Sequence, residues 1–227
     1  MSSGGVCLSY DDWFVDEWSA AAPIFEHYGA RATFYVARME SLTPRQIDKL
    51  LDLQKRGHEI GSHTSSHAKA ASYLLTRTVE QYMNEEVDRG LAFLRSRGFK
   101  VTSFAYPHHE FVTMLDPLLL ERFDILRYRW DGPLLQDRLY EPGTVRVVNV
   151  AGSLDLTGTK VSSADTDAIL RAAQQAQRVA VFCGHNIGSA GPKGTHYCTQ
   201  ADLETFIADI ARRDLKFHCV REMAAGC

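Results

Sequence analysis

The chain has 227 residues with a formal net charge of −3, and 45% of its residues are hydrophobic. This length and composition support one sizeable core, so we expect a single domain over residues 1–227. Because no basic stripe and no bilayer-length apolar run occur, we expect neither a nucleic-acid partner nor a membrane span. No charged-then-apolar leader precedes the first motif, so we expect a cytoplasmic protein with reduced cysteines, unless a leader has been removed.

Short apolar runs alternate with helical stretches along the whole chain. The runs expected to form strands are residues 6–10, 32–36, 58–61, 102–106, 125–128, 145–150, 179–183 and 217–220. The stretches expected to form helices are residues 43–57, 78–98, 163–178 and 199–213. This alternation favours a parallel α/β sheet. Seven or eight such units in this length fit a barrel better than an open sheet, an alternative that spacing alone does not exclude.

Polar motifs stand at the C-terminal ends of four expected strands. They are Asp11 and Asp12 after the first strand, His63 and His67 after the third, His108 after the fourth and His185 after the seventh. In a parallel barrel this end of the strands carries the active site. The shared position therefore predicts that these side chains belong to one site.

Asp12, His63 and His67 offer a carboxylate and two imidazoles to one metal ion. This ligand count leaves coordination positions for water and substrate, as in a catalytic zinc site. If a helical turn begins at His63, the two histidines lie on one face. Taken alone, an Asp-Asp pair is more often an N-cap or a solvated turn, and such histidines more often lie in an exposed loop. Together they favour one divalent ion, zinc first and other divalent transition metals as alternatives, with Asp11 free to act as a base.

Two further histidines offer catalytic groups. His185 could protonate a leaving group, although a loop histidine that caps a helix end is an equal alternative. Because Pro107 has no N–H, the backbone N–H of His108 is the next free donor and could hold an oxyanion. An ordinary Tyr-Pro turn is the alternative reading. We interpret His108-His109-Glu110 as a polar loop rim rather than a second metal site.

Aromatic residues follow the two aspartates at Trp13, Phe14 and Trp18. Aromatic rings beside a site often stack on sugar rings. The same residues could equally form the hydrophobic start of a helix, and the sequence leaves both interpretations open.

These motifs resemble those of the polysaccharide deacetylases, the carbohydrate esterase family that shares a NodB homology domain. The family's Thr-Phe-Asp-Asp-Gly motif appears here as Ser-Tyr-Asp-Asp-Trp at residues 9–13, and its His-Ser/Thr-x-x-His motif appears at residues 63–67. Residues 104–107 resemble the Phe-x-Tyr-Pro form found in exopolysaccharide deacetylases. His185 stands where the family's late Leu-x-His histidine is expected. The similarity covers nearly the whole chain and implies a distorted (β/α) barrel of about seven strands.

The resemblance also implies a role for each matching residue. The implied roles are metal ligands for Asp12, His63 and His67, general base for Asp11, general acid for His185, and part of the oxyanion hole for the His108 N–H.

The chain departs from the family pattern at several of these motifs. Trp13 replaces a glycine, His108 and His109 replace Tyr-Gly, and Cys183 replaces a leucine. The arginine that many members use to orient the base is absent from its motif. The family's Asp-Trp motif is not recognisable, which leaves Asp155 as the guessed partner of the late histidine. These changes bear on the substrate more than on the reaction.

The sequence therefore predicts a metal-dependent hydrolase that removes the acetyl group from an N-acetylated amino sugar, a glycan or a related amide. A hydrolase of the same fold that acts on a non-sugar amide, such as a ureide or a cyclic imide, is a close alternative. A catalytically inactive glycan-binding domain is an alternative from another class. Retention of both Asp11 and His185 speaks against it, because a pure binder needs neither.

Overall fold

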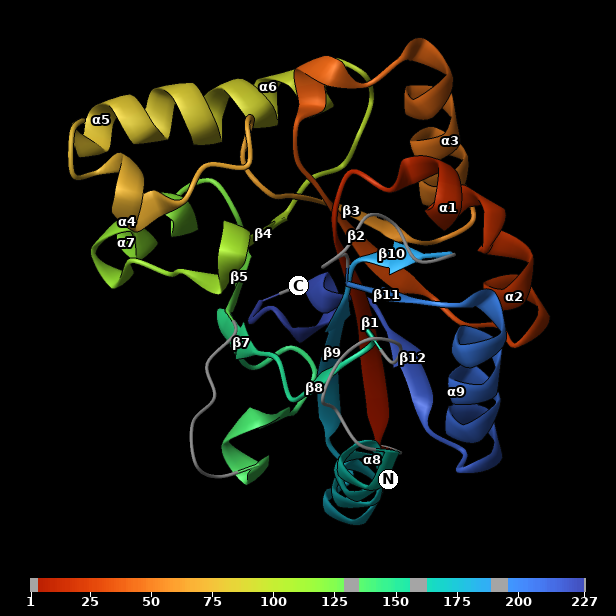
Figure 1. Cartoon of the computed structure of the whole chain (residues 1–227). Coiled ribbons are helices and arrows are strands. Elements are labelled where there is room, and N and C mark those ends of the chain that lie inside the picture. Colours follow the sequence, from red (N-terminus) through yellow and green to blue (C-terminus); the bar gives the residue numbers. More distant parts are fainter. Residues whose placement is uncertain (1–3, 129–134, 156–162, 189–195, 227) are drawn as a thin grey trace.

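The computed structural model describes residues 4–128, 135–155, 163–188 and 196–226. Within this part the main sheet has the strand order β6-β9-β1-β2-β3-β4-β5-β7, with β12 also beside β1 and β8 also beside β9 (Figure 1). Its strands are β1 (Gly5–Asp12), β2 (Ala32–Val36), β3 (Glu59–Ser62), β4 (Ser103–Ala105), β5 (Ile125–Tyr128), β6 (Leu139–Tyr140), β7 (Val147–Asn149), β8 (Gly152–Ser153), β9 (Val179–Gly184) and β12 (Lys216–His218). A separate pair consists of β10 (Asn186–Ile187) and β11 (Tyr197–Cys198).

The expected distorted barrel is confirmed. The described pairs of the main sheet are parallel, apart from the antiparallel pair of β6 and β9. Every residue of β2, β3, β4, β5 and β9 is buried, which in β2 and β9 agrees with their largely apolar sequences. After β7 the chain returns to β9, where Ala151 N–H donates to the Val181 carbonyl at 2.7 Å. This contact nearly closes the sheet on itself.

Four long helical stretches were expected, and each is present. They are α3 (Pro44–Lys55), the continuous run of α5 (Val79–Tyr82), a π-helical segment (Met83–Asp88) and α6 (Arg89–Arg95), then α8 (Ser163–Ala176) and α9 (Gln200–Arg212). Capping boxes at Thr43, Thr78 and Thr199 begin three of them. A helix start near Trp18 was one of two interpretations left open, and α1 (Val15–Ala20) forms there. The sequence did not predict the π-helical segment, nor the short helices α2 (Ala22–His27), α4 (Ala70–Tyr73) and α7 (Asp116–Leu120).

Aromatic packing fixes α1 against the barrel. Trp18 is fully buried and its ring lies 5.1 Å from that of Phe34 on β2. The indole N–H of Trp18 also donates to the His185 carbonyl at 2.8 Å. Trp18 therefore belongs to the core, where it ties α1 to the loop that carries His185.

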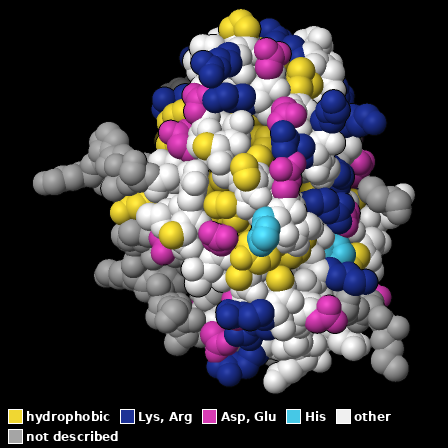
Figure 2. Space-filling model, turned by 90° about the vertical axis from the view of Figure 1, so that its right-hand side faces the viewer, with side chains coloured by type: hydrophobic (Ala, Val, Ile, Leu, Met, Phe, Trp, Pro, Cys, Tyr) yellow, Lys and Arg dark blue, Asp and Glu magenta, His cyan; other side chains and the backbone are white. Residues whose placement is uncertain are grey.

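The helices α1, α2, α3 and α9 flank one side of the barrel, at the right of Figure 1. The helices α5 and α6 lie along the top of the same view. On that flank acidic and basic side chains are interspersed (Figure 2). No helix in the described ranges is long and apolar enough to cross a membrane. The described cysteines are free and buried, namely Cys7, Cys183, Cys198 and Cys219.

Candidate active site

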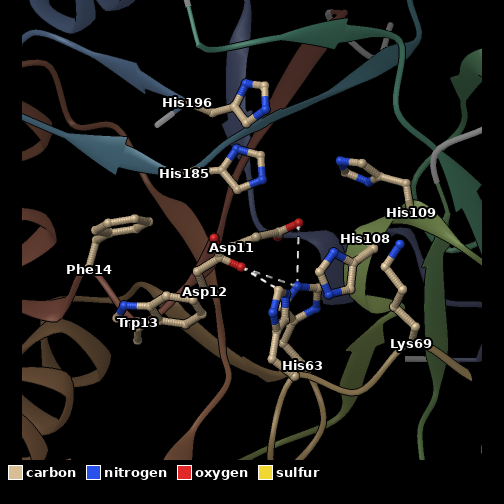
Figure 3. A pocket seen from close by; sticks show the side chains of 11 residues that line it. Asp11, Asp12, Trp13, Phe14, His63, Lys69, His108, His109, His185 and His196 are labelled. Carbon is tan, nitrogen blue, oxygen red and sulfur yellow. Dashed lines mark ion pairs between the residues drawn. The ribbon is translucent and has the colours of Figure 1, made fainter. Parts of the chain in front are cut away.

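The predicted strand-end residues line a single cavity of about 470 Å³ (Figure 3). Its lining residues are Asp11, Asp12, Trp13, Phe14, His63, His67, Lys69, His108, His109, His185 and His196. They come from the C-terminal ends of β1, β3, β4 and β9 and from the segments that follow. The expectation that these motifs share one face of the barrel is therefore confirmed.

Asp12, His63 and His67 bring three potential metal-ligand atoms together, all within 4.8 Å of one another. Nε2 of His67 lies 3.0 Å from Asp12 Oδ1, and Nε2 of His63 lies 3.8 Å from the same oxygen. Asp12 has φ 89° and His67 has φ 71°, both in a region that costs free energy for residues other than glycine. Such backbone strain is typical of functional sites, where the surrounding fold holds a side chain in place.

The tautomer of His63 follows from its partner. Its Nδ1–H donates to the Ala105 carbonyl at 2.8 Å, so Nε2 carries the lone pair and faces the aspartates. Burial lowers the pKa of His63 to about 4, which keeps the ring neutral. A neutral imidazole oriented through its other nitrogen is the form that binds metal ions.

The loop from His63 to His67 does not form the helical turn considered above. Thr64 has φ 64°, and its hydroxyl accepts hydrogen bonds from the backbone N–H groups of His67 and Ala68 at 3.1 and 3.2 Å. The loop turns back on itself, so the two imidazoles meet through a bend rather than through helical spacing. Their ring centroids lie 5.0 Å apart.

The π-helical segment holds this loop from outside. The Glu86 backbone carbonyl accepts the Ser65 N–H at 2.8 Å, and the Glu86 carboxylate accepts the Ser66 N–H and hydroxyl at 2.9 and 2.7 Å. A π-helical turn widens the helix and releases a carbonyl for an outside partner. The irregular helix thus anchors the residues between the two histidines.

Asp11 forms a buried ion pair with Arg127 of β5. Arg127 Nη2 lies 2.6 Å from Asp11 Oδ2, with side-chain exposures of 0% and 2%. Burial by itself raises the pKa of Asp11, but the charge of Arg127, together with His63, His185 and His109, outweighs it and holds the pKa well below its ordinary value. The arginine that is absent from its motif is therefore replaced by Arg127 on β5. A single charged residue inside the apolar run 125–128 was the available signal.

His185 lies against Asp155, as guessed from the sequence. Its Nδ1–H donates to Asp155 Oδ2 at 2.7 Å, and its backbone N–H donates to Oδ1 at 3.0 Å. Burial lowers the pKa of His185, but the hydrogen bond and charge of Asp155 outweigh it and raise the pKa above the ordinary value. His196, with 63% of its side chain exposed, places Nδ1 3.9 Å from the same carboxylate oxygen.

His108 and His109 follow Pro107 in a short turn and have φ 57° and 58°. The His108 ring lies 4.3 Å from that of His67, and partial desolvation lowers the pKa of His108 although the residue is exposed at the mouth of the cavity. His109 lies 6.1 Å from the His185 ring, measured between centroids. Both side chains face the cavity instead of forming only its rim (Figure 3).

Trp13 and Phe14 also line the cavity, and their rings stack with centroids 5.8 Å apart. The guanidinium of Arg38 lies 3.6 Å above the Trp13 ring, which also contacts His67 edge-on at 5.5 Å. Trp13 is therefore held in one place beside the two histidines. Each of the two sequence interpretations holds for part of this group. Trp13 and Phe14 line the cavity, whereas Trp18 belongs to the helix and the core.

A sequence model described as polysaccharide deacetylase matches residues 1–116. The chain belongs to the polysaccharide deacetylase family. A search of curated proteins found no match.

Solved structures of this family share the fold of the chain at low sequence identity. A Streptococcus mutans family 4 carbohydrate esterase has a TM-score of 0.65 and 17% identity, over 96% of this chain and 86% of that one. A family 4 carbohydrate esterase from Streptomyces lividans, in complex with acetate, has a TM-score of 0.63 and 17% identity, over 99% and 98%. The catalytic domain of a peptidoglycan N-acetylglucosamine deacetylase from Eubacterium rectale has a TM-score of 0.61 and 15% identity, over 99% and 93%.

The residues of this deacetylase-family site fit a divalent metal ion. The His63 tautomer leaves Nε2 as a ligand atom, and a carboxylate and a second imidazole converge on it without a cationic side chain among the three. Sequence reasoning identified these residues, but it missed Arg127, Lys69 and His196 as neighbours of the site.

Proposed function

We propose that the chain is a metal-dependent hydrolase that removes the acetyl group from the nitrogen of an amino sugar in a glycan. Family membership supports the reaction class, and similar structures include a peptidoglycan N-acetylglucosamine deacetylase. One observation carries the proposal: three kinds of group meet in one cavity. They are the potential metal ligands, the ionised carboxylate of Asp11, and His185 paired with the Asp155 carboxylate.

Asp12, His63 and His67 would hold one divalent ion, for which zinc suits a set of one oxygen and two nitrogen atoms. When bound, such an ion polarises a carbonyl and lowers the pKa of water. The remaining chemistry belongs to side chains of the protein, and each has a position in the cavity that suits its task.

Asp11 takes the proton from the attacking water. Arg127 occupies one carboxylate oxygen, Oδ2, and keeps the group ionised, while Oδ1 remains for the proton. A buried carboxylate held in one orientation loses little entropy when the reaction begins. Arg127 is therefore a positioning residue for the base.

His185 delivers a proton to the departing amine. An amine leaves a tetrahedral intermediate poorly unless it is protonated as the bond breaks. Asp155 fixes the ring through Nδ1 and favours the charged form, so Nε2–H is the donor toward the cavity. The backbone N–H of His108 would help to hold the oxyanion.

The pairing of both proton-transfer groups favours a catalyst over an inactive glycan-binding domain. A domain that only binds a glycan gains nothing from a buried ion pair at Asp11 or from the Asp155–His185 hydrogen bond. Trp13 stands beside the ligand side chains, where it narrows the approach for a chain of sugars. We therefore expect a short or end-on substrate.

The test measures acetate and free amine released from N-acetylglucosamine and its oligomers. The protein is assayed as purified, after chelation and dialysis, and after zinc is restored. We expect release to disappear on chelation and to return with zinc, at a rate per site that is higher for short substrates. Release that persists after verified metal removal would contradict metal dependence, and a preference for long oligomers would contradict the substrate size.

A further inference from the structure

A second group of potential ligand atoms lies next to the first. Asp11 of β1, His109 of the turn after β4 and Cys183 of β9 each place one such atom within 4.8 Å of the others. None of the three belongs to the set of Asp12, His63 and His67. We propose that Asp11, His109 and Cys183 form a separate site for a thiophilic divalent ion such as Zn²⁺.

The carboxylate of Asp11 has an oxygen to offer. Its Oδ2 accepts hydrogen bonds from Arg127 Nη2 at 2.6 Å and from the Cys183 thiol at 3.4 Å. Its Oδ1 is buried and has no hydrogen-bond partner among the described residues, in a side chain that is 2% exposed. A buried carboxylate oxygen without a partner is costly, and a cation is one group that can satisfy it.

Cys183 determines which class of ion this site would select. The combination of thiolate, imidazole and carboxylate is typical of zinc sites, whereas magnesium and calcium prefer oxygen ligands alone. The thiol is 3% exposed and protonated, because burial raises its pKa. Binding therefore forms a sulfur–metal bond and releases the thiol proton to solvent.

The geometry needs only a small adjustment. In a tetrahedral zinc site, neighbouring ligand atoms lie about 3.4–3.6 Å apart. The three ligand atoms already lie within 4.8 Å of one another. His109 is half-buried and belongs to a short turn at the cavity. A shift of that imidazole by about one ångström completes the set.

Neighbouring positive charges make this the weaker of the two sites. Arg127 contacts Asp11 directly, and His185 favours its charged form nearby. Both positive groups repel a second cation. The site at Cys183 offers two anionic ligands, a carboxylate and a thiolate, whereas the set of Asp12, His63 and His67 offers one, but we expect the repulsion to outweigh this difference. We therefore expect the ion at Cys183 to bind after the first site is filled.

If the proposed function holds, occupation of this site should inhibit the enzyme. The ion would bind the Asp11 carboxylate, which is the proposed base, and excess zinc would then inhibit turnover. The existence of the site does not depend on that role. Its test therefore uses a signal from the sulfur–metal bond instead of activity.

The experiment titrates the metal-free full chain with Co²⁺ and follows near-ultraviolet absorption. A cobalt–thiolate bond gives a charge-transfer band, and the first ligand set contains no sulfur. We compare the wild-type protein with Cys183→Ser, His109→Asn and the matched control Cys198→Ser, which changes a buried cysteine outside the group. Asparagine suits position 109 because it tolerates positive φ.

We expect the wild-type band to grow with the second equivalent of cobalt. It should be absent in Cys183→Ser, unchanged in Cys198→Ser, and shifted to at least about tenfold higher cobalt in His109→Asn. If the band instead grows with the first equivalent, the site at Cys183 stands and the expected order of filling is wrong. The proposal is overturned if the wild-type protein gives no band, if the band survives in Cys183→Ser, or if His109→Asn binds cobalt as the wild type does.

Discussion

Asp11 and Arg127 form a buried ion pair that links β1 to β5, with 2.6 Å between Asp11 Oδ2 and Arg127 Nη2. The two residues stand 116 positions apart in the chain. Because both side chains are buried, each buried charge is compensated mainly by the other. The same contact leaves Oδ1 of Asp11 as the oxygen that can take part in chemistry.

We expect Arg127→Met to lower the free energy of unfolding by about 3–5 kcal/mol, because it leaves the Asp11 carboxylate buried without its charged partner. Urea denaturation measures the loss. The control is Arg89→Met, which removes an ion pair with Glu40 whose side chains are 58% and 55% exposed. That change should cost less than about 1 kcal/mol. An equal loss in the free energy of unfolding in the two variants would show that the buried ion pair stabilises the fold no more than the exposed one.

Asp11→Asn should bind zinc at the first site normally and lose about 10²–10⁴ in turnover, because the amide cannot accept the proton from water. Metal analysis and steady-state rates are measured on the same preparation. Asp16→Asn, an exposed carboxylate on α1, serves as the control and should keep both properties. An Asp11→Asn protein with wild-type turnover, or one that has lost its first-site zinc, contradicts the role of base.

His185→Gln should reduce hydrolysis of N-acetyl amides by about 10²–10⁴ but reduce hydrolysis of an activated acetyl ester much less. The reason is that the ester leaving group departs without a proton. Asp155→Asn should change the amide-to-ester ratio in the same direction, since Asp155 orients His185 and favours its charged form. If amide and ester rates fall by the same factor, His185 is structural.

His58 should make stability depend on pH. It is buried against Phe25, its Nδ1 accepts the Ala32 N–H at 3.1 Å, and burial lowers its pKa to about 4. The unfolded chain binds this proton below about pH 6.5, whereas the folded chain does so only near pH 4. Stability from this group is therefore full above the unfolded pKa and declines as pH falls through that window, by up to about 3 kcal/mol.

The measurement is urea denaturation of wild type and His58→Asn between about pH 4 and pH 7. Asparagine keeps an acceptor but does not titrate, so the variant should show a shallower loss of stability on acidification. His27→Asn, which changes an exposed histidine on α2, should leave the slope unaltered. Parallel curves for His58→Asn and wild type would contradict the assignment.

Strands were predictable where a largely apolar run is bounded, as in residues 32–36 and 179–183, whereas the two-residue strands β6, β8, β10 and β11 were not predicted. The long helices were predictable where a threonine capping box begins them, as at Thr43 and Thr199. The helices α1 and α2 lack a side-chain cap, and their formation depends on burial of Trp18 and Phe25. Tertiary packing decides such elements, and local sequence does not record it.

The candidate site was predictable where the chain places two groups within a short motif, as in Asp11-Asp12 or residues 63–67. It was not predictable where the partner comes from a distant strand. A charge inside an apolar run marks Arg127 as unusual, but nothing near it in the sequence identifies Asp11 as its partner. The bend at Thr64, formed in place of a helical turn, depends on Glu86 from another element.

The most direct test of the account is zinc content after equilibrium dialysis against limiting zinc, measured for wild type, Asp12→Ala, His67→Ala and the exposed-histidine control His27→Ala. We expect about one ion per chain in wild type and in the control, and at least about a tenfold loss of affinity in the other two variants, because each loses one of three ligands. Full zinc occupancy in His67→Ala would contradict the central claim that Asp12, His63 and His67 hold the catalytic ion.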